Sequence, residues 1–246
     1  MSEVRTQAQR PLVFFHVMKC GGTSVRAGLA VGAAGRPGGT EIFELDGQVA
    51  QAAAGGTNAD NWRFRDALLP YVLVAMRPSI VVGHFRYRDG YNELLDSAHF
   101  VTMLRDPVDR LVSLYKYRRY KEGIDVPVSI SFDEFIGSKR WAKEGHAYVD
   151  TFSGSDDLDP RSDEAVSAAV ANLRRFAVVG VIDRLEDFSQ QVTSCLGRPV
   201  TIPMLNKSPA PGARGDTDID AGTLERAREV CEPDSQVYEQ AMATLA

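Results

Sequence analysis

The sequence has few of the residues that build disulfide frameworks or membrane spans. Its 246 residues include three cysteines, Cys20, Cys195 and Cys231, an odd number with no Cys-x-x-Cys spacing. This pattern argues against a disulfide scaffold and is typical of reduced thiols in a reducing compartment. No apolar run approaches the roughly 20 residues that cross a bilayer, and residues 1–10 are polar. We therefore expect a cytoplasmic protein without a membrane span.

The chain also lacks an excess of positive charge. Its 28 lysines and arginines face 33 aspartates and glutamates, which gives a formal net charge of −5. Nucleic acids and highly sulfated polymers require a broad positive field, so neither is an expected partner. There is no His-Glu-x-x-His motif, no clustered Cys/His spacing and no evident aspartate pair for magnesium, so no metal is expected.

The composition, in contrast, is sufficient for one sizeable core. With 44% hydrophobic residues and no linker or repeat, the chain is expected to form a single domain over 1–246, with 1–10 as a flexible tail. Apolar runs alternate with helical patterns, which predicts an α/β fold of three layers, a central and mostly parallel sheet flanked by helices. The expected strands are 11–17, 42–45, 79–83, 99–104 and 177–182. The expected helices are 23–31, 61–74, one beginning at Pro107, 132–136, 140–148, 162–176, 185–196, 220–231 and 234–244. Apart from the short strand, residues 32–58 have no assigned structure.

The first chemical motif lies where the apolar run at 13–17 meets a glycine turn, in the string Lys19-Cys20-Gly21-Gly22-Thr23-Ser24. Two glycines bring backbone N–H groups close to an anion, a helix beginning at about Thr23 directs its positive end there, and Lys19 adds a full charge. A Walker A loop has its lysine after the glycines, whereas Lys19 precedes them. Alone, the string is equally consistent with a turn and a helix cap.

The second motif is a strand that leads into a helix at Arg105-Asp106-Pro107. Asp106 suits the N-cap and Pro107 the first helical position. Arg105 in the turn and Ser113 about two turns into the helix can then meet one ligand, because a guanidinium offers a fork of donors for phosphate and the serine adds a neutral one. Both motifs in one chain favour an anion site over two separate caps.

Together these motifs resemble sulfotransferases that use 3'-phosphoadenosine 5'-phosphosulfate (PAPS), especially the branch containing heparan sulfate 2-O-sulfotransferase. Met18 stands where that branch usually has proline. The resemblance implies a P-loop NTPase-like sulfotransferase fold and a PAPS donor. It also implies that Lys19, Cys20, Gly21, Gly22, Thr23 and Ser24 bind the 5'-phosphosulfate, with Lys19 also catalytic, and that Arg105 and Ser113 bind the 3'-phosphate.

The same resemblance makes His84 the general base. The segment Gly83-His84-Phe85 is similar to a family segment in which the histidine takes the proton from the acceptor hydroxyl, and an imidazole titrates near neutrality. His16 is expected to shape the loop. Other branches of the family use a glutamate base, and the alternatives of that kind in this chain are Glu41, Glu44, Asp46 and Asp60.

Two further basic segments lie outside these motifs. Lys207, Ser208 and Arg214 belong to a Pro/Gly-rich stretch that resembles a loop closing over the nucleotide, although an ordinary surface loop is an equal alternative. Residues 116–121 are rich in basic side chains, which could guide an anionic acceptor. A solvated helix end that complements the helix dipole is the favoured interpretation.

The predicted reaction is transfer of a sulfuryl group from PAPS to a hydroxyl of a glycan or other small molecule. A kinase-like phosphoryl transferase and a non-catalytic nucleotide-binding protein are the alternatives. The acceptor itself depends on loops whose shape the sequence does not specify.

Overall fold

The centre of the protein is a five-stranded sheet in which every strand pair is parallel. The computed structural model describes residues 10–33, 42–55, 58–121, 127–205 and 219–245. The strands are β1 (Leu12–Phe15), β2 (Ile42–Leu45), β3 (Ile80–Gly83), β4 (His99–Leu104) and β5 (Val178–Val181), in the order β2-β3-β1-β4-β5. The predicted α/β fold is confirmed, with a sheet that is wholly rather than mostly parallel.

The strands form because short apolar runs are covered on both faces. Every residue of β1 and β3 is buried, as expected for a parallel sheet between two layers of helices. Phe15 pairs with Gly83 on one side and with Thr102 on the other, so β1 and β3 end at the same level. The residues that follow these strands therefore emerge at one edge of the sheet, where parallel α/β proteins bind ligands.

Ten helices and four short turns connect the strands in the described part of the chain. The helices are α1 (Gly22–Ala33), α2 (Gly47–Ala53), α3 (Asn58–Tyr71), α4 (Pro107–Tyr120), α5 (Phe132–Gly137), α6 (Ala147–Phe152), α7 (Asp163–Leu173), α8 (Leu185–Leu196), α9 (Ala221–Val230) and α10 (Glu232–Leu245). The turns are the π-helical η1 (Val72–Met76) and the 3-10 helices η2 (Asp89–Leu94), η3 (Ala142–His146) and η4 (Ile182–Arg184). Within the described ranges, no helix is long and apolar enough to cross a membrane.

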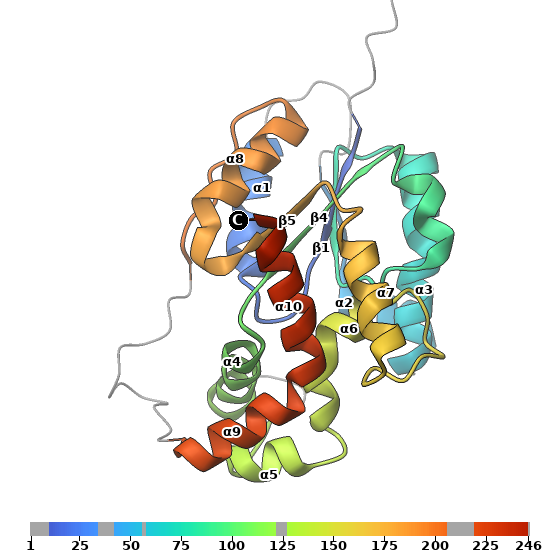
Figure 1. Ribbon diagram of the computed structural model, residues 1–246. Helices are drawn as coiled ribbons and strands as arrows, with labels where there is room; N and C mark the ends of the chain where they lie inside the picture. Colours follow the sequence, from blue (N-terminus) through green and yellow to red (C-terminus); the bar gives the residue numbers. More distant parts are fainter. Residues whose placement is uncertain (1–9, 34–41, 56–57, 122–126, 206–218, 246) are drawn as a thin grey trace, which may run out of the picture.

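Figure 1 shows α1 and α8 on one side of the sheet and α3 and α7 on the other, with α4, α5 and α9 gathered where β4 leads into α4. The main core lies between the sheet and these covering helices. A second, smaller core lies between α4, α5 and α9 and includes Leu111, Tyr115, Phe135 and Ala227. One face of α4 is thereby held against its own core, and its opposite face can line a site.

The structure corrects some expected boundaries. Helix α2 and turn η2 were not predicted. Helix α2 lies in a Gly/Ala-rich stretch with little apolar periodicity. It begins at Asp46, whose side chain accepts from two backbone N–H groups and so caps the helix. The single helix expected over 140–148 is instead η3 followed by α6. Gly145 lies directly against Val230 of α9, with no room for a side chain, and the chain changes helix type just beyond it.

Candidate active site

A pocket of about 500 Å³ opens at the carboxyl ends of β1, β3 and β4. The predicted site residues that line it are Lys19, Gly21, Gly22, Thr23, Ser24, His84, Arg105 and Ser113. They come from three separate strand ends and two helices, α1 and α4. The structure thus brings both sequence motifs and His84 together around one space, whose volume is in the range typical of ligand sites.

The loop after β1 has a backbone that few sequences adopt. Gly21 has φ of 75°, and Lys19, which is not a glycine, has φ of 68°. A left-handed residue with a side chain costs roughly 1–2 kcal/mol, and such strain clusters at functional sites. The loop ends in α1, where Ser24 and Val25 donate their N–H groups to the Gly21 carbonyl. The earlier N–H groups of this helix have no intrahelical acceptor and suit an anion.

Basic side chains gather in one part of the pocket, which Asp109 and Asp183 also line. The Lys19 ammonium lies 4.3 Å from the centre of the Tyr117 ring. Burial lowers the pKa of Lys19, and the nearby charges of Lys121 and Arg105 lower it further. The Arg105 guanidinium has only a long contact, 3.9 Å, to the carboxylate of Asp109. We call this part of the pocket the anion end (Lys19, Arg105 and Lys121), because its basic side chains would suit an anion.

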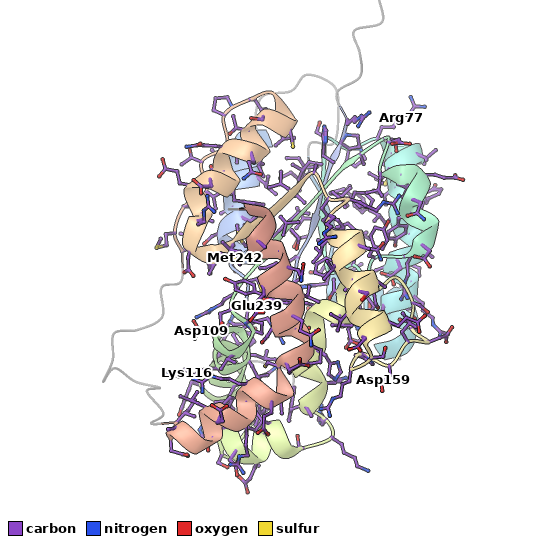
Figure 2. The ribbon with its side chains drawn as sticks, viewed as in Figure 1. Arg77, Asp109, Lys116, Asp159, Glu239 and Met242 are labelled. Carbon is purple, nitrogen blue, oxygen red and sulfur yellow. The ribbon has the colours of Figure 1, made fainter. Side chains whose placement is uncertain are left out.

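Helix α4 presents one face to this end. Asp106 accepts from the Asp109 N–H at 2.9 Å and Pro107 takes the first helical position, so the predicted start is confirmed. Leu111 and Leu114 are fully buried, whereas Ser113 is partly exposed on the pocket side, as the helical spacing predicts. Figure 2 labels Asp109 in the first turn of α4 and Lys116 further along the same helix.

A buried tyrosine fixes the turn that carries Arg105. The Tyr148 hydroxyl accepts from the Arg105 N–H at 2.9 Å and donates to the Arg105 carbonyl at 2.5 Å. The backbone N–H of Tyr148 donates in turn to Asp234 of α10 at 2.8 Å. The Cys20 thiol lies 3.4 Å from the same hydroxyl, buried in the core rather than lining the pocket. Burial raises the pKa of Cys20 to about 11, so this thiol stays neutral.

The opposite part of the pocket, the histidine end (His16 and His84), contains two stacked imidazoles. The ring centres are 4.2 Å apart at an interplanar angle of 25°. His84 Nδ1 lies 2.6 Å from the His16 carbonyl oxygen, and because a carbonyl only accepts, Nδ1 carries the proton. The unprotonated Nε2 is then the proton acceptor of the His84 ring.

Both imidazoles are neutral at physiological pH. Burial lowers the pKa of His84 to about 4, with a further contribution from the Arg65 charge. Burial also lowers the pKa of His16 to about 3, and proximity to His84 adds to the effect. The histidine end is therefore free of charge where the anion end is rich in it.

A second pocket of about 140 Å³ lies on the other side of the two histidines. It shares His16, Met18 and His84 with the first pocket, so these residues stand between the two spaces. Its outer wall includes Trp62, whose ring lies 5.0 Å from the Arg86 guanidinium carbon. A ligand there would approach His84 from the side opposite the anion end.

Some predicted candidates have other contacts. The Ser24 hydroxyl accepts from the Leu205 N–H at 3.0 Å, which ties this residue to the segment that closes one side of the pocket. Of the acidic alternatives to His84, Glu44 pairs with Arg26 at 2.9 Å and Asp46 caps α2, and neither lines the pocket. The side chains of Glu41 and Asp60, and the whole of Lys207, Ser208 and Arg214, lie outside the described residues.

The structure also adds residues that the sequence interpretation missed. Tyr117 and Lys121 line the pocket, which the favoured solvated-face interpretation of residues 116–121 did not include, although Lys121 is exposed as that interpretation expects. Tyr117 follows Ser113 by four residues and Lys121 follows Tyr117 by four, and this spacing was the available signal, because i and i+4 share one face of a helix. Ile182 and Asp183, which follow β5, also line it, and only their place at a strand end could have indicated them. Across the described residues, no three His, Cys, Asp or Glu side chains gather as metal ligands would.

Comparison with known proteins gives matches in structure only. No protein-family profile matches the sequence, and no curated protein matches it significantly. Among solved structures, the chain is similar to a sulfotransferase from Alicyclobacillus acidocaldarius, with 17% identity, coverage of 95% of this chain and 96% of that chain, and a TM-score of 0.49. It is also similar to the mouse sulfotransferase SULT7A1 complexed with PAP, with 14% identity, coverage of 90% of this chain and 64% of that chain, and a TM-score of 0.39. The chain thus spans less than two thirds of the mouse protein, and both of these neighbours are sulfotransferases.

Proposed function

We propose that the protein is a cytoplasmic sulfotransferase that moves a sulfuryl group from PAPS to a hydroxyl of a small molecule or glycan. The observation that carries the proposal is the meeting, in one pocket, of Lys19, Arg105 and Ser113 with a neutral His84. The loop sequence, which resembles that of the heparan sulfate 2-O branch, is consistent with it.

The anion end supplies what such a donor requires. The N–H groups at the start of α1, with Lys19 and Thr23, would bind the 5'-phosphosulfate, while Arg105 and Ser113 would bind the 3'-phosphate. Arg105 and Ser113 would also distinguish the donor from ATP, which has no 3'-phosphate. Among the described residues, these cations have no short ion pair with a carboxylate. Most of their electrostatic attraction would therefore be available to a bound anion.

The histidine end supplies the chemistry. His84 Nε2 would accept the proton of the acceptor hydroxyl while the hydroxyl oxygen bonds to sulfur and the bond from sulfur to the bridging phosphate oxygen breaks. The products would be a sulfate ester and adenosine 3',5'-bisphosphate (PAP), and Lys19 would stabilise the negative charge that develops on the bridging oxygen. The second pocket shares His16 and His84 with the first, and we expect the acceptor to bind there.

A calorimetric titration with PAP, in parallel with ATP plus magnesium and with AMP, tests the donor class. Binding of PAP alone, followed by transfer of label from ³⁵S-labelled PAPS to an acceptor in a panel of hydroxylated compounds, is the expected result. Preference for ATP with magnesium would instead support a phosphoryl transferase. Binding of PAP without donor consumption over a wide panel would support a non-catalytic nucleotide-binding protein.

A further inference from the structure

The pocket-facing stripe of α4 continues beyond the residues of the motif. Asp109, Ser113, Tyr117 and Lys121 follow one another at intervals of four residues and all line the larger pocket. Residues at this spacing lie above one another on one side of a helix. Of the residues in this stripe, Ser113 alone was expected to bind the donor, so the far half of the stripe, Tyr117 and Lys121, has no assigned role.

Tyr117 holds two ammonium groups on one ring. The Lys19 Nζ lies 4.3 Å from the ring centre and the Lys121 Nζ 4.8 Å from it. Cation–π attraction of this kind is modest but favourable at exposed sites. It therefore restrains Lys121, an exposed residue at the end of α4, beside the lysine of the loop.

The two lysines are also close enough to influence one another. Among neighbouring charges, Lys121 makes the largest contribution to the lowered pKa of Lys19. Among the described residues, neither ammonium has a carboxylate at ion-pair distance. Two like charges beside one ring repel each other, and an anion bound near both would be attracted to each of them and offset this repulsion.

We propose that Lys121, positioned by Tyr117, is a second cationic contact for the phosphosulfate end of the donor. This inference rests on the proposed function, in which Lys19 marks that end of the pocket. Arg105 and Ser113 serve the 3'-phosphate, and Lys121 shares its tyrosine with Lys19 rather than with Arg105. Lys121 therefore recognises the 5' substituent of the nucleotide and not the 3' one.

Two nucleotides separate these roles. PAP carries both phosphates, whereas adenosine 3'-monophosphate lacks the 5'-phosphate. K121Q should weaken PAP binding about tenfold, the usual order for one charged contact, and leave the affinity for adenosine 3'-monophosphate unchanged. K121R should restore most of the PAP affinity, and Y117L should lower it in the same direction as K121Q. Calorimetry of each variant with each nucleotide measures these differences.

The matched control is K139Q, which removes an exposed lysine that lines neither pocket and should change neither affinity. An unchanged PAP affinity in K121Q, or an equal loss for both nucleotides, would overturn the inference while leaving the proposed function in place. Failure of the unaltered protein to bind PAP would overturn both.

Discussion

The two ends of the larger pocket differ in charge and in the way they are built. At the anion end, a helix face and a strained loop bring the basic side chains of Lys19, Arg105 and Lys121 together. At the histidine end, His16 and His84 are partly buried and neutral, stacked on one another where two strands finish. The anion end would attract a negatively charged ligand. The histidine end would provide an uncharged proton acceptor.

This difference indicates that binding and chemistry are separable in this pocket. The anion end would contribute equally to the donor and to the bisphosphate product, and so would mainly set affinity. The histidine end would contribute only when the acceptor hydroxyl loses its proton, and so would set rate. Substitutions at the two ends should therefore change different measured quantities.

The largest effect is expected from H84A. Removal of the base should lower the transfer rate about a thousandfold, within the range of general-base contributions, while PAP affinity changes less than threefold. Single-turnover transfer of labelled sulfuryl and calorimetry with PAP measure the two quantities on the same protein preparation.

H84N is the matched variant for this test. An asparagine amide can still donate to the His16 carbonyl, but it has no equivalent of Nε2, so its loss of rate should equal that of H84A. A large loss of PAP affinity in both variants would assign His84 to nucleotide binding. Binding and chemistry would then not be separable between the two ends of the pocket.

A smaller effect, on affinity rather than rate, is expected from R105A. Loss of the fork of donors to the 3'-phosphate should weaken PAP binding roughly a hundredfold and abolish the preference for PAP over AMP. R105K should recover little, because one ammonium cannot make the paired contact. The exposed Arg161 provides the control, since R161A should bind PAP normally. A preference for PAP that survives in R105A would contradict the assignment.

The neutral histidines should also make stability depend on pH. In the unfolded chain these imidazoles gain protons below about pH 6.5, whereas burial holds the folded pKa values at about 4 for His84 and about 3 for His16. The unfolded state therefore binds more protons in this window, and the free energy of unfolding falls as pH falls, by up to about 1.4 kcal/mol per pH unit for each imidazole. In urea titrations between pH 7 and 4.5, the free energy of unfolding should fall less steeply with pH for H84N than for the unaltered protein. An equally steep fall in the two proteins would contradict the burial of His84 as a neutral imidazole.

The smallest effect is expected at Ser24, whose hydroxyl bonds to the Leu205 backbone. S24A would release the Leu205 backbone at one wall of the pocket and should weaken PAP binding about threefold. S194A removes a hydroxyl that donates to the Gln190 carbonyl within α8, away from the pocket, and should leave affinity unchanged. A loss in S24A as large as that in R105A would mean that this hydroxyl binds the nucleotide directly.

Much of this architecture could be predicted from local sequence signals. Apolar runs gave all five strands, including the short one at 42–45, and the pair Asp106-Pro107 predicted the start of α4. Strand ends of a parallel sheet share one edge, so the convergence of Lys19, His84 and Arg105 could also be expected. These signals lie within a few residues of the features they predict.

The remaining features depend on contacts between distant segments. The stacking of His16 on His84 joins residues 68 positions apart, and the bond from Tyr148 to Arg105 spans 43 positions. The basic run at 116–121 has the composition of a solvated helix end, and only the position of α4 against its own core turns Tyr117 and Lys121 toward the pocket. No pattern within one element contains this information.

Gly22 lies where the loop after β1 meets α1, and the imidazole of His16 occupies the space that a side chain at position 22 would need. The His16 carbonyl in turn holds the His84 ring. A single added methyl group at position 22 would thus displace the ring that stacks on the proposed base, although Gly22 has no side chain of its own. Variation at positions 16 and 22 is therefore expected to be coupled, and a redesign of donor binding in this protein would have to change both positions together.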